Sequence, residues 1–211
     1  MSSGQPIKVW DVGVRLFHWT LVLAYAVAYL SGEVESDRLH IIAGYAVLAL
    51  IGFRLVWGFV GTRHARFVDF VYGPAATWRY ARSMWTRAPL HYLGHNPLGG
   101  WMVVALLLSL AAACWSGLEA YGAQGHGPLA QAGLVASAYA NGDGGRDADD
   151  DETHDAEGDE FWEELHEFFS HLTLLLVALH IAGAVAASLL HRENLVKAMI
   201  TGYKRPQGPR T

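Results

Sequence analysis

The chain has 211 residues, of which 52% are hydrophobic and 17% are charged, with a formal net charge of −5. This composition is too apolar for an ordinary soluble domain of that size, and nothing in it predicts a nucleic-acid partner. The single cysteine, Cys114, excludes a disulfide framework within the chain.

Four stretches of the sequence are long and apolar enough to cross a membrane, which takes about 20 residues. They run over residues 14–31, 39–60, 98–118 and 161–191. The fourth stretch is longer than a bilayer requires, so its acidic start is expected to project into water. The sequence therefore predicts an all-α integral membrane four-helix bundle, with one domain over residues 1–211.

Most of the 15 Lys and Arg residues precede the first span, lie between the second and third, or follow the fourth. Because such residues favour the cytoplasmic side, both termini are predicted to be cytoplasmic. Residues 119–160 then form an acidic periplasmic loop, which composition predicts to be irregular. Pro74 is predicted to begin a short amphipathic helix on the cytoplasmic surface, with a plain loop as the alternative.

Four histidines lie within or at the ends of the spans, namely His18, His40, His166 and His180. His166 and His180 are 14 residues apart, which places them roughly 40° apart around one helix and about 21 Å apart along it. That spacing is too long for one metal ion, but it suits two haems, one near each membrane surface. Each iron then needs a second ligand from another helix at the same depth.

The predicted pairs are His40 with His166, named here the outer pair, and His18 with His180, the inner pair. Two imidazoles on one iron close both axial positions, which favours electron transfer. His191 lies on nearly the same helix face as His180 and is a rival ligand. A His-rich metal-ion transporter is the alternative interpretation, and it would need ligands clustered within a few ångströms.

Three further residues fit the haem interpretation. Gly44 and Gly183 each lie about one turn after a predicted ligand, where a small residue would let a porphyrin approach, although helix packing explains them equally. Arg54 lies inside the second span and is expected to pair with a haem propionate. The alternative is that its side chain reaches the membrane interface.

Several motifs resemble the bacterial cytochrome b561 family, including the b-type subunits of nickel–iron hydrogenases. They are VWDVGVRLFHW, HIIAGY, GHNPLGGWMV, ELHEFFSHLTLLLVALH and HRENLVKAMITGYKR, which together extend over most of the chain. The resemblance implies that His18, His40, His166 and His180 are the ligands of two haem b groups, and it favours His180 over His191. It also implies a multi-pass protein of the bacterial inner membrane.

The resemblance further implies electron transfer between membrane quinone and a redox partner protein. In hydrogenase-like members the start of the third helix is associated with quinone, which corresponds to His95 and Asn96 here. A near-neutral pKa would let His95 accept a proton from quinol, and the alternative is that it only packs or caps the helix start.

The partner is expected to be a catalytic oxidoreductase subunit or a basic periplasmic c-type cytochrome that docks on the acidic loop of residues 119–160. A solvated loop without a partner is the alternative. The sequence leaves open whether the chain is itself a quinol/quinone oxidoreductase, an electron-transfer subunit of one, or a non-catalytic haem-bearing anchor. It also leaves open a homo-oligomer.

Overall fold

The computed structural model describes residues 5–34, 36–84, 92, 94–129, 148–191 and 193–204, without the side chains of residues 148–159. The chain divides into two compact units. One, the terminal unit, combines Met1–Leu107 with Leu175–Thr211, and the other, the middle unit, is Leu108–Leu174. The sequence did not predict this division, which crosses two of the long helices.

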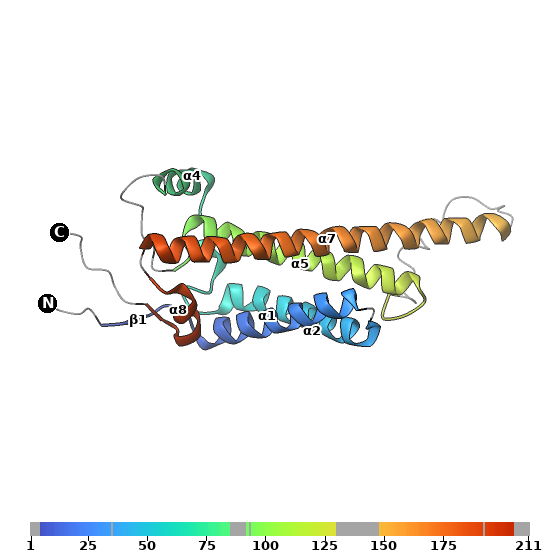
Figure 1. Cartoon of the computed structure of the whole chain (residues 1–211), viewed down its shortest axis with the longest axis horizontal. Coiled ribbons are helices and arrows are strands. Elements are labelled where there is room, and N and C mark those ends of the chain that lie inside the picture. The colour runs from blue at the N-terminus through green and yellow to red at the C-terminus, as the bar shows by residue number, and fades with distance from the viewer. Residues whose placement is uncertain are drawn as a thin grey trace. The chain divides into compact units, whose positions relative to one another are not determined.

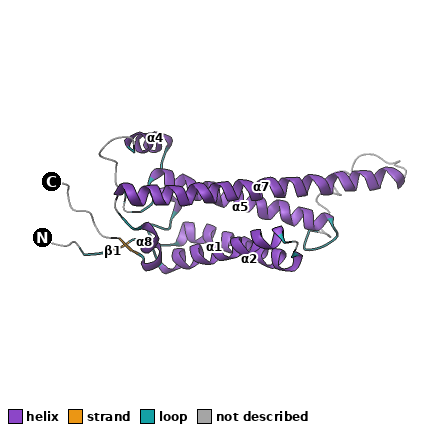
Figure 2. Ribbon diagram, viewed as in Figure 1, coloured by secondary structure: helices purple, strands orange, loops and turns teal. Residues whose placement is uncertain are grey.

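Four long helices dominate the chain (Figure 1), and nearly all of its regular structure is helical (Figure 2). They are α1 (Val12–Glu33), α2 (Asp37–Val60), α5 (Pro97–Ala123) and α7 (Ala148–His191). Each contains a segment long and apolar enough to cross a membrane, and in α7 this segment is Glu160–His191. The predicted all-α membrane protein with four spans is thereby confirmed.

The helices extend beyond the spans that hydropathy predicted. α5 continues to Ala123, and α7 begins at Ala148, so a part of the predicted acidic loop of residues 119–160 is helical. Low sequence complexity suggested an irregular segment, and residues 130–147 of it lie outside the described part.

Large apolar side chains cover the outside of the long helices. On α1, Leu16, Leu23 and Leu30 recur every seven residues and are 66%, 67% and 63% exposed. Such a stripe would be unfavourable in water, but lipid tails are as apolar as leucine. The exposed stripe therefore agrees with a membrane as the surrounding solvent.

The terminal unit also contains several short elements. They are α3 (Phe67–Phe70), α4 (Pro74–Ser83), α8 (Leu195–Thr201) and a two-stranded antiparallel sheet of β1 (Ile7–Lys8) and β2 (Tyr203–Lys204). α4 is the short helix predicted to begin at Pro74, and its Trp78 is 73% exposed.

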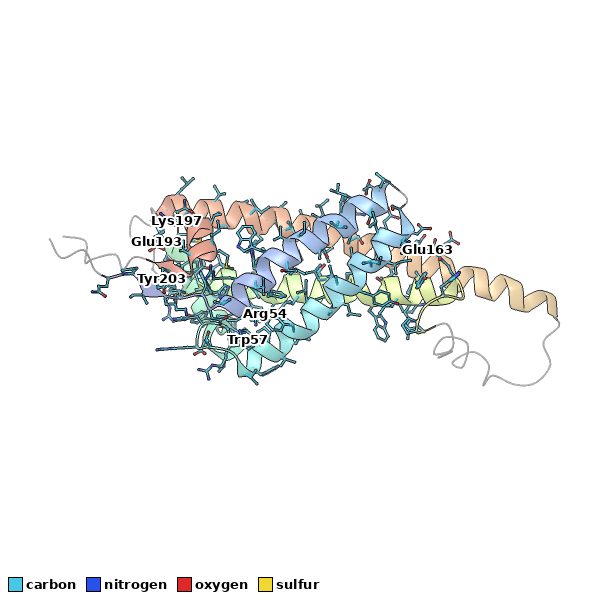
Figure 3. The ribbon with its side chains drawn as sticks, turned by 90° about the horizontal axis from the view of Figure 1, so that it is seen from below. Arg54, Trp57, Glu163, Glu193, Lys197 and Tyr203 are labelled. Atoms are coloured by element: carbon cyan, nitrogen blue, oxygen red, sulfur yellow. The ribbon has the colours of Figure 1, made fainter. Side chains whose placement is uncertain are left out.

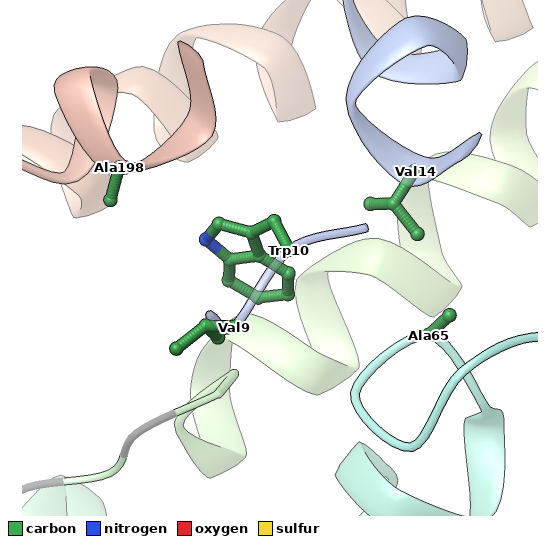
Figure 4. Close-up of a cluster of buried hydrophobic side chains, with 5 residues drawn as sticks. All are labelled: Val9, Trp10, Val14, Ala65 and Ala198. Atoms are coloured by element: carbon green, nitrogen blue, oxygen red, sulfur yellow. The ribbon is translucent and has the colours of Figure 1, made fainter. Parts of the chain in front are cut away.

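A small hydrophobic core joins the N-terminal stretch, the segment after α2 and α8. Five buried side chains from these three stretches meet in it, namely Val9, Trp10, Val14, Ala65 and Ala198 (Figure 4). Gly202 ends α8 with a φ of +87°, and its carbonyl accepts hydrogen bonds from the backbone of Val9 and Trp10. A Cβ at Gly202 would lie 2.7 Å from the Trp10 carbonyl oxygen, so only glycine fits this junction.

Asp11 connects the start of α1 to the end of α2. Its carboxylate caps α1 by accepting a hydrogen bond of 2.9 Å from the Val14 backbone N–H, and it also accepts from the Trp57 indole and the Thr62 hydroxyl. Burial by itself would raise the pKa of Asp11, but these hydrogen bonds hold that pKa below its ordinary value. The negative charge therefore persists where α1 and α2 meet.

Candidate functional site

The imidazole rings of the inner pair lie close together within the terminal unit. His18 is on α1 and His180 is on α7, and their ring centroids are 6.4 Å apart with 51° between the ring planes. Two imidazoles that bind one metal ion from opposite sides, each through a bond of about 2.0 Å, have centroids roughly 6 Å apart. The observed separation therefore fits a metal centre between the two rings.

The ring of His18 contains a nitrogen that the protein leaves unsatisfied. Its Nδ1 atom is buried and has no hydrogen-bond partner among the described residues. A buried polar nitrogen is costly unless a hydrogen bond or a metal satisfies it. His191, the rival ligand, lies at the end of α7 and is buried, while the ring that faces His18 is that of His180.

The two outer histidines share a different arrangement. His40 Nδ1 lies 2.9 Å from the Ala28 carbonyl oxygen of α1, and His166 Nδ1 lies 2.8 Å from the Ala113 carbonyl oxygen of α5. A carbonyl only accepts, so Nδ1 carries the hydrogen in both rings and Nε2 is the atom with a lone pair for a metal. This is the arrangement that metal-binding histidines typically have.

His40 belongs to the terminal unit and His166 to the middle unit. The structure shows the surroundings of each histidine within its own unit, so the pairing of His40 with His166 stays a prediction. Among the described residues, no group of three or more His, Cys, Asp or Glu side chains could hold a metal ion.

Gly44 and Gly183 leave space beside their helices. Beyond its own helix backbone, a Cβ at either glycine would have no atom of the described residues within 4 Å. The same is true of Gly52, so open space alone does not single out a porphyrin contact. Both glycines are compatible with a flat ligand, and neither is explained by close helix packing in the described part.

Arg54 lies on α2 near Trp57 (Figure 3) and is only 2% exposed. Its guanidinium carbon lies 4.8 Å from the ring centroid of Phe67 and 5.6 Å from that of Phe70. The Nη1 atom is buried and has no hydrogen-bond partner in the described part of the chain. The side chain is therefore enclosed by protein, and an anionic group such as a haem propionate would satisfy its guanidinium, so this pairing stays a prediction.

His95 is packed between two aromatic rings. Its ring centroid is 4.6 Å from that of Trp10 and 4.7 Å from that of Phe70, and its Nδ1 atom is buried. Burial, followed by the charges of Arg54 and Lys204, lowers the pKa of His95 to about 3. The near-neutral pKa expected for His95 is therefore wrong, and this imidazole is a weak proton acceptor.

Asn96 caps the start of α5. Its Oδ1 atom accepts a hydrogen bond of 2.7 Å from the Gly99 backbone N–H. The alternative that this segment packs and caps the helix start thus describes both residues, and a quinone contact at either stays a prediction.

Sequence reasoning missed the backbone acceptors of the two outer histidines. The signal that would have found them is a repeated Ala-x-x-Ser-Gly pattern at residues 28–32 and 113–117. The pattern is short, and neither copy stands out within an apolar helix.

Comparisons with known proteins show which family the chain resembles. The family model of prokaryotic cytochrome b561 matches residues 9–202. Proteins named probable Ni/Fe-hydrogenase B-type cytochrome subunit from Rhizobium leguminosarum bv. viciae and Cupriavidus necator are each 26% identical to the chain. The alignments cover 95% and 97% of this chain and 89% and 90% of those proteins. A protein of the same name from Azotobacter vinelandii is 32% identical over 44% of the chain. No solved structure matches significantly.

Proposed function

Because the chain belongs to the prokaryotic cytochrome b561 family, a family of haem-bearing electron-transfer proteins of the membrane, we propose that it holds two haem b groups on four histidines. The inner pair, His18 and His180, would hold one, and the outer pair, His40 and His166, would hold the other. The observation that carries this proposal is the 6.4 Å separation between the ring centroids of His18 and His180.

Haem b, when bound, supplies an iron that gains or loses one electron without a change of ligands. The chain's own residues would bind and orient the haem groups. His40 and His166 would each offer Nε2 to an iron, because a backbone carbonyl holds their Nδ1–H, and His18 and His180 would hold the other iron between their rings. Arg54 would offer a buried positive charge to a propionate, and the surrounding apolar side chains would exclude water. Gly44 and Gly183 leave room beside the ligand helices.

We further propose that the chain transfers electrons between membrane quinone and a redox partner, with both termini in the cytoplasm of a bacterial cell and the four helices in its inner membrane. The names of the relatives point to a nickel–iron hydrogenase as one partner. A basic periplasmic c-type cytochrome that docks on residues 119–160 is the second candidate, suggested by the acidic composition. A quinone would bind near His95 and Asn96, with His95 as a neutral hydrogen-bonding group.

The haem content of single-histidine variants tests this proposal. In purified protein in lipid nanodiscs, we expect wild type to contain two b-type haems per chain. His18→Ala and His180→Ala should each reduce the ratio to one, because a single axial ligand holds haem more weakly. His171→Ala is the matched control, since His171 is on the same helix but is exposed, with its ring nitrogen bound to the Glu167 carbonyl.

Two results would contradict the proposal. Retention of both haems in His180→Ala would show that the inner pair is not a ligand pair, and loss of a haem in His191→Ala instead would make that residue the ligand. A reduced-minus-oxidised spectrum without a b-type α band would favour the metal-ion transporter.

The word subunit in the names of the relatives suggests a second candidate function, in which the chain is a non-catalytic, haem-bearing anchor of a larger oxidoreductase. Purified chain that is reduced by quinol without any other subunit would exclude it.

A further inference from the structure

Two five-residue segments with the same pattern contact the outer histidines. AYLSG runs from Ala28 to Gly32 on α1, and ACWSG runs from Ala113 to Gly117 on α5. One segment lies in the terminal unit and the other in the middle unit. The two contacts are therefore independent observations of the same local arrangement.

In the first segment, one backbone carbonyl receives two side-chain donors. The Ala28 carbonyl oxygen accepts a hydrogen bond of 2.9 Å from His40 Nδ1 and one of 3.0 Å from Ser31 Oγ. Ser31 is only 4% exposed. Gly32, one turn after Ala28, faces the ring, and a Cβ there would lie 3.2 Å from His40 Nδ1.

The second segment repeats each of these contacts. The Ala113 carbonyl oxygen lies 2.8 Å from His166 Nδ1 and 3.1 Å from Ser116 Oγ, which also reaches the Ala112 carbonyl oxygen at 2.9 Å. Ser116 is fully buried. A Cβ at Gly117 would lie 2.9 Å from both Nδ1 and Cε1 of His166.

The glycine explains how an imidazole can reach a carbonyl inside a helix. That carbonyl already accepts the N–H of the residue four positions later, and the side chain of that residue normally shields it. Here the residue four positions later is Gly32 or Gly117, so the ring approaches without a clash. Glycine costs about 1 kcal/mol in a helix interior relative to alanine, so Gly117, which lies inside α5, needs a local reason, whereas Gly32 lies in the last turn of α1.

The serine affects the strength of the hydrogen bond between the imidazole and the carbonyl. A carbonyl oxygen has two lone pairs, and in each segment three donors share them: the helix N–H, the serine hydroxyl and the imidazole Nδ1–H. The serine therefore competes with the histidine for the same oxygen. Since an acceptor at Nδ1 raises the basicity of Nε2 toward a metal, the competition moderates that basicity.

We propose that the two Ala-x-x-Ser-Gly segments are matched positioning sites, which orient His40 and His166 through a shared carbonyl and adjust how strongly their Nε2 atoms bind iron. This rests on the proposed function, in which these two histidines are iron ligands. Gly32 and Gly117 admit the ring, and Ser31 and Ser116 weaken the hydrogen bond. His18 lacks such a contact, because its Nδ1 has no hydrogen-bond partner in the described part of the chain.

The reduction potential of the outer haem tests the proposal, because glycine and serine variants should move it in opposite directions. Gly117→Ala and Gly32→Ala push the ring from the carbonyl, which lowers Nε2 basicity and raises the potential. Gly117→Ala should have the larger effect, about tenfold in the one-electron equilibrium or 59 mV, because its Cβ would be closer to the ring. Ser31→Ala and Ser116→Ala free the carbonyl for the histidine, so the potential falls by a smaller amount.

The measurement is a redox titration of the α band in nanodiscs, in which the component that shifts should be the one that survives His180→Ala. Gly52→Ala is the control for adding a methyl group to a helix, since no described atom beyond its own helix backbone would lie within 4 Å of the new Cβ. Thr77→Ala is the control for removing a hydroxyl that bonds its own helix, here to the Gly73 carbonyl. Neither control should shift either component.

Each outcome has one interpretation. Shifts of opposite sign in the glycine and serine variants support the positioning sites. Potentials equal to that of wild type, or shifts of the same sign in both kinds of variant, overturn them. If the glycine variants bind no outer haem, the serine variants decide by the sign of their shift, and no shift counts against the proposal. If His40→Ala and His166→Ala keep both haems and both potentials, the proposed function itself fails.

Discussion

Buried positive side chains gather near His95 in the terminal unit. Arg54 is 2% exposed and Lys204 is 8% exposed, and Lys204 Nζ lies 3.6 Å from a carboxylate oxygen of Glu193. Burial lowers the pKa of Lys204, and Glu193 partly offsets that shift. In this positive environment a neutral His95 is favoured over a charged one.

The stability of the protein should therefore depend on pH through His95. Its pKa of about 3 lies below the ordinary value of 6.5, so the folded state binds this proton less well than the unfolded state. The contribution of neutral His95 to the free energy of unfolding is complete above pH 6.5. It is lost as the pH falls toward 3, with a slope of about 1.4 kcal/mol per pH unit. Thermal unfolding in nanodiscs from pH 7.5 to 4.5 measures it.

His95→Gln should flatten that dependence, because glutamine keeps a polar group but does not titrate. The exposed His171 supplies the control, since His171→Gln should leave the slope as in wild type. Equal slopes in wild type and His95→Gln would show that His95 titrates normally in the folded protein.

Single contacts between elements decide how the helix ends are arranged. Gly100 lies in the first turn of α5, where the chain approaches α3, and a Cβ there would lie 2.2 Å from the Phe70 carbonyl oxygen. The adjacent Trp101 donates its indole N–H to the Tyr72 carbonyl at 3.0 Å. Together they hold the segment after α3 against the start of α5.

Gly100→Ala should lower the stability of the terminal unit by about 1–3 kcal/mol, the usual cost of forcing extra volume into a packed site. A backbone oxygen cannot move aside as a flexible side chain can, so α3 or α5 must shift. Gly52→Ala adds the same methyl group on α2, where the described residues beyond its own helix place no atom within 4 Å, and it should be neutral or stabilising. Equal melting temperatures of the two variants would contradict the close contact.

At the scale of the whole molecule, acidic residues are concentrated in one segment, and one helix is much longer than a membrane span. More than half of the 20 acidic residues lie between residues 119 and 160. α7 has 44 residues and is therefore about 66 Å long, roughly twice the hydrocarbon thickness of a bilayer. Its acidic start must extend beyond the membrane, where it adds negative charge to that surface.

Electron transfer to a basic c-type cytochrome should weaken as salt rises, if the acidic segment is a docking surface. Screening shortens the range of such attraction from about 30 Å at 0.01 M salt to about 8 Å at 0.15 M. Stopped-flow reduction of a basic cytochrome by the reduced protein measures this dependence. A chain with Asp149, Asp150 and Asp151 changed to Asn should show a weaker dependence, whereas rates that ignore salt would exclude docking there.

Much of the membrane architecture is present in the sequence. Every helix in a bilayer must satisfy its backbone internally and present about 20 apolar residues to lipid, so hydropathy alone located the four spans. The helical start of α7 escaped prediction because acidic, low-complexity sequence is typical both of irregular segments and of exposed helices.

The candidate ligands could be identified in advance because histidines are rare in apolar spans and because helical periodicity converts the spacing of His166 and His180 into a distance. Their hydrogen-bond partners could not. The Ala113 carbonyl lies 53 residues from His166 in sequence, and every helix contains many such carbonyls. Only the packing of α5 against α7 selects one of them. In the same way, only the fold buries His95 and brings Arg54 and Lys204 near it, which together lower its pKa.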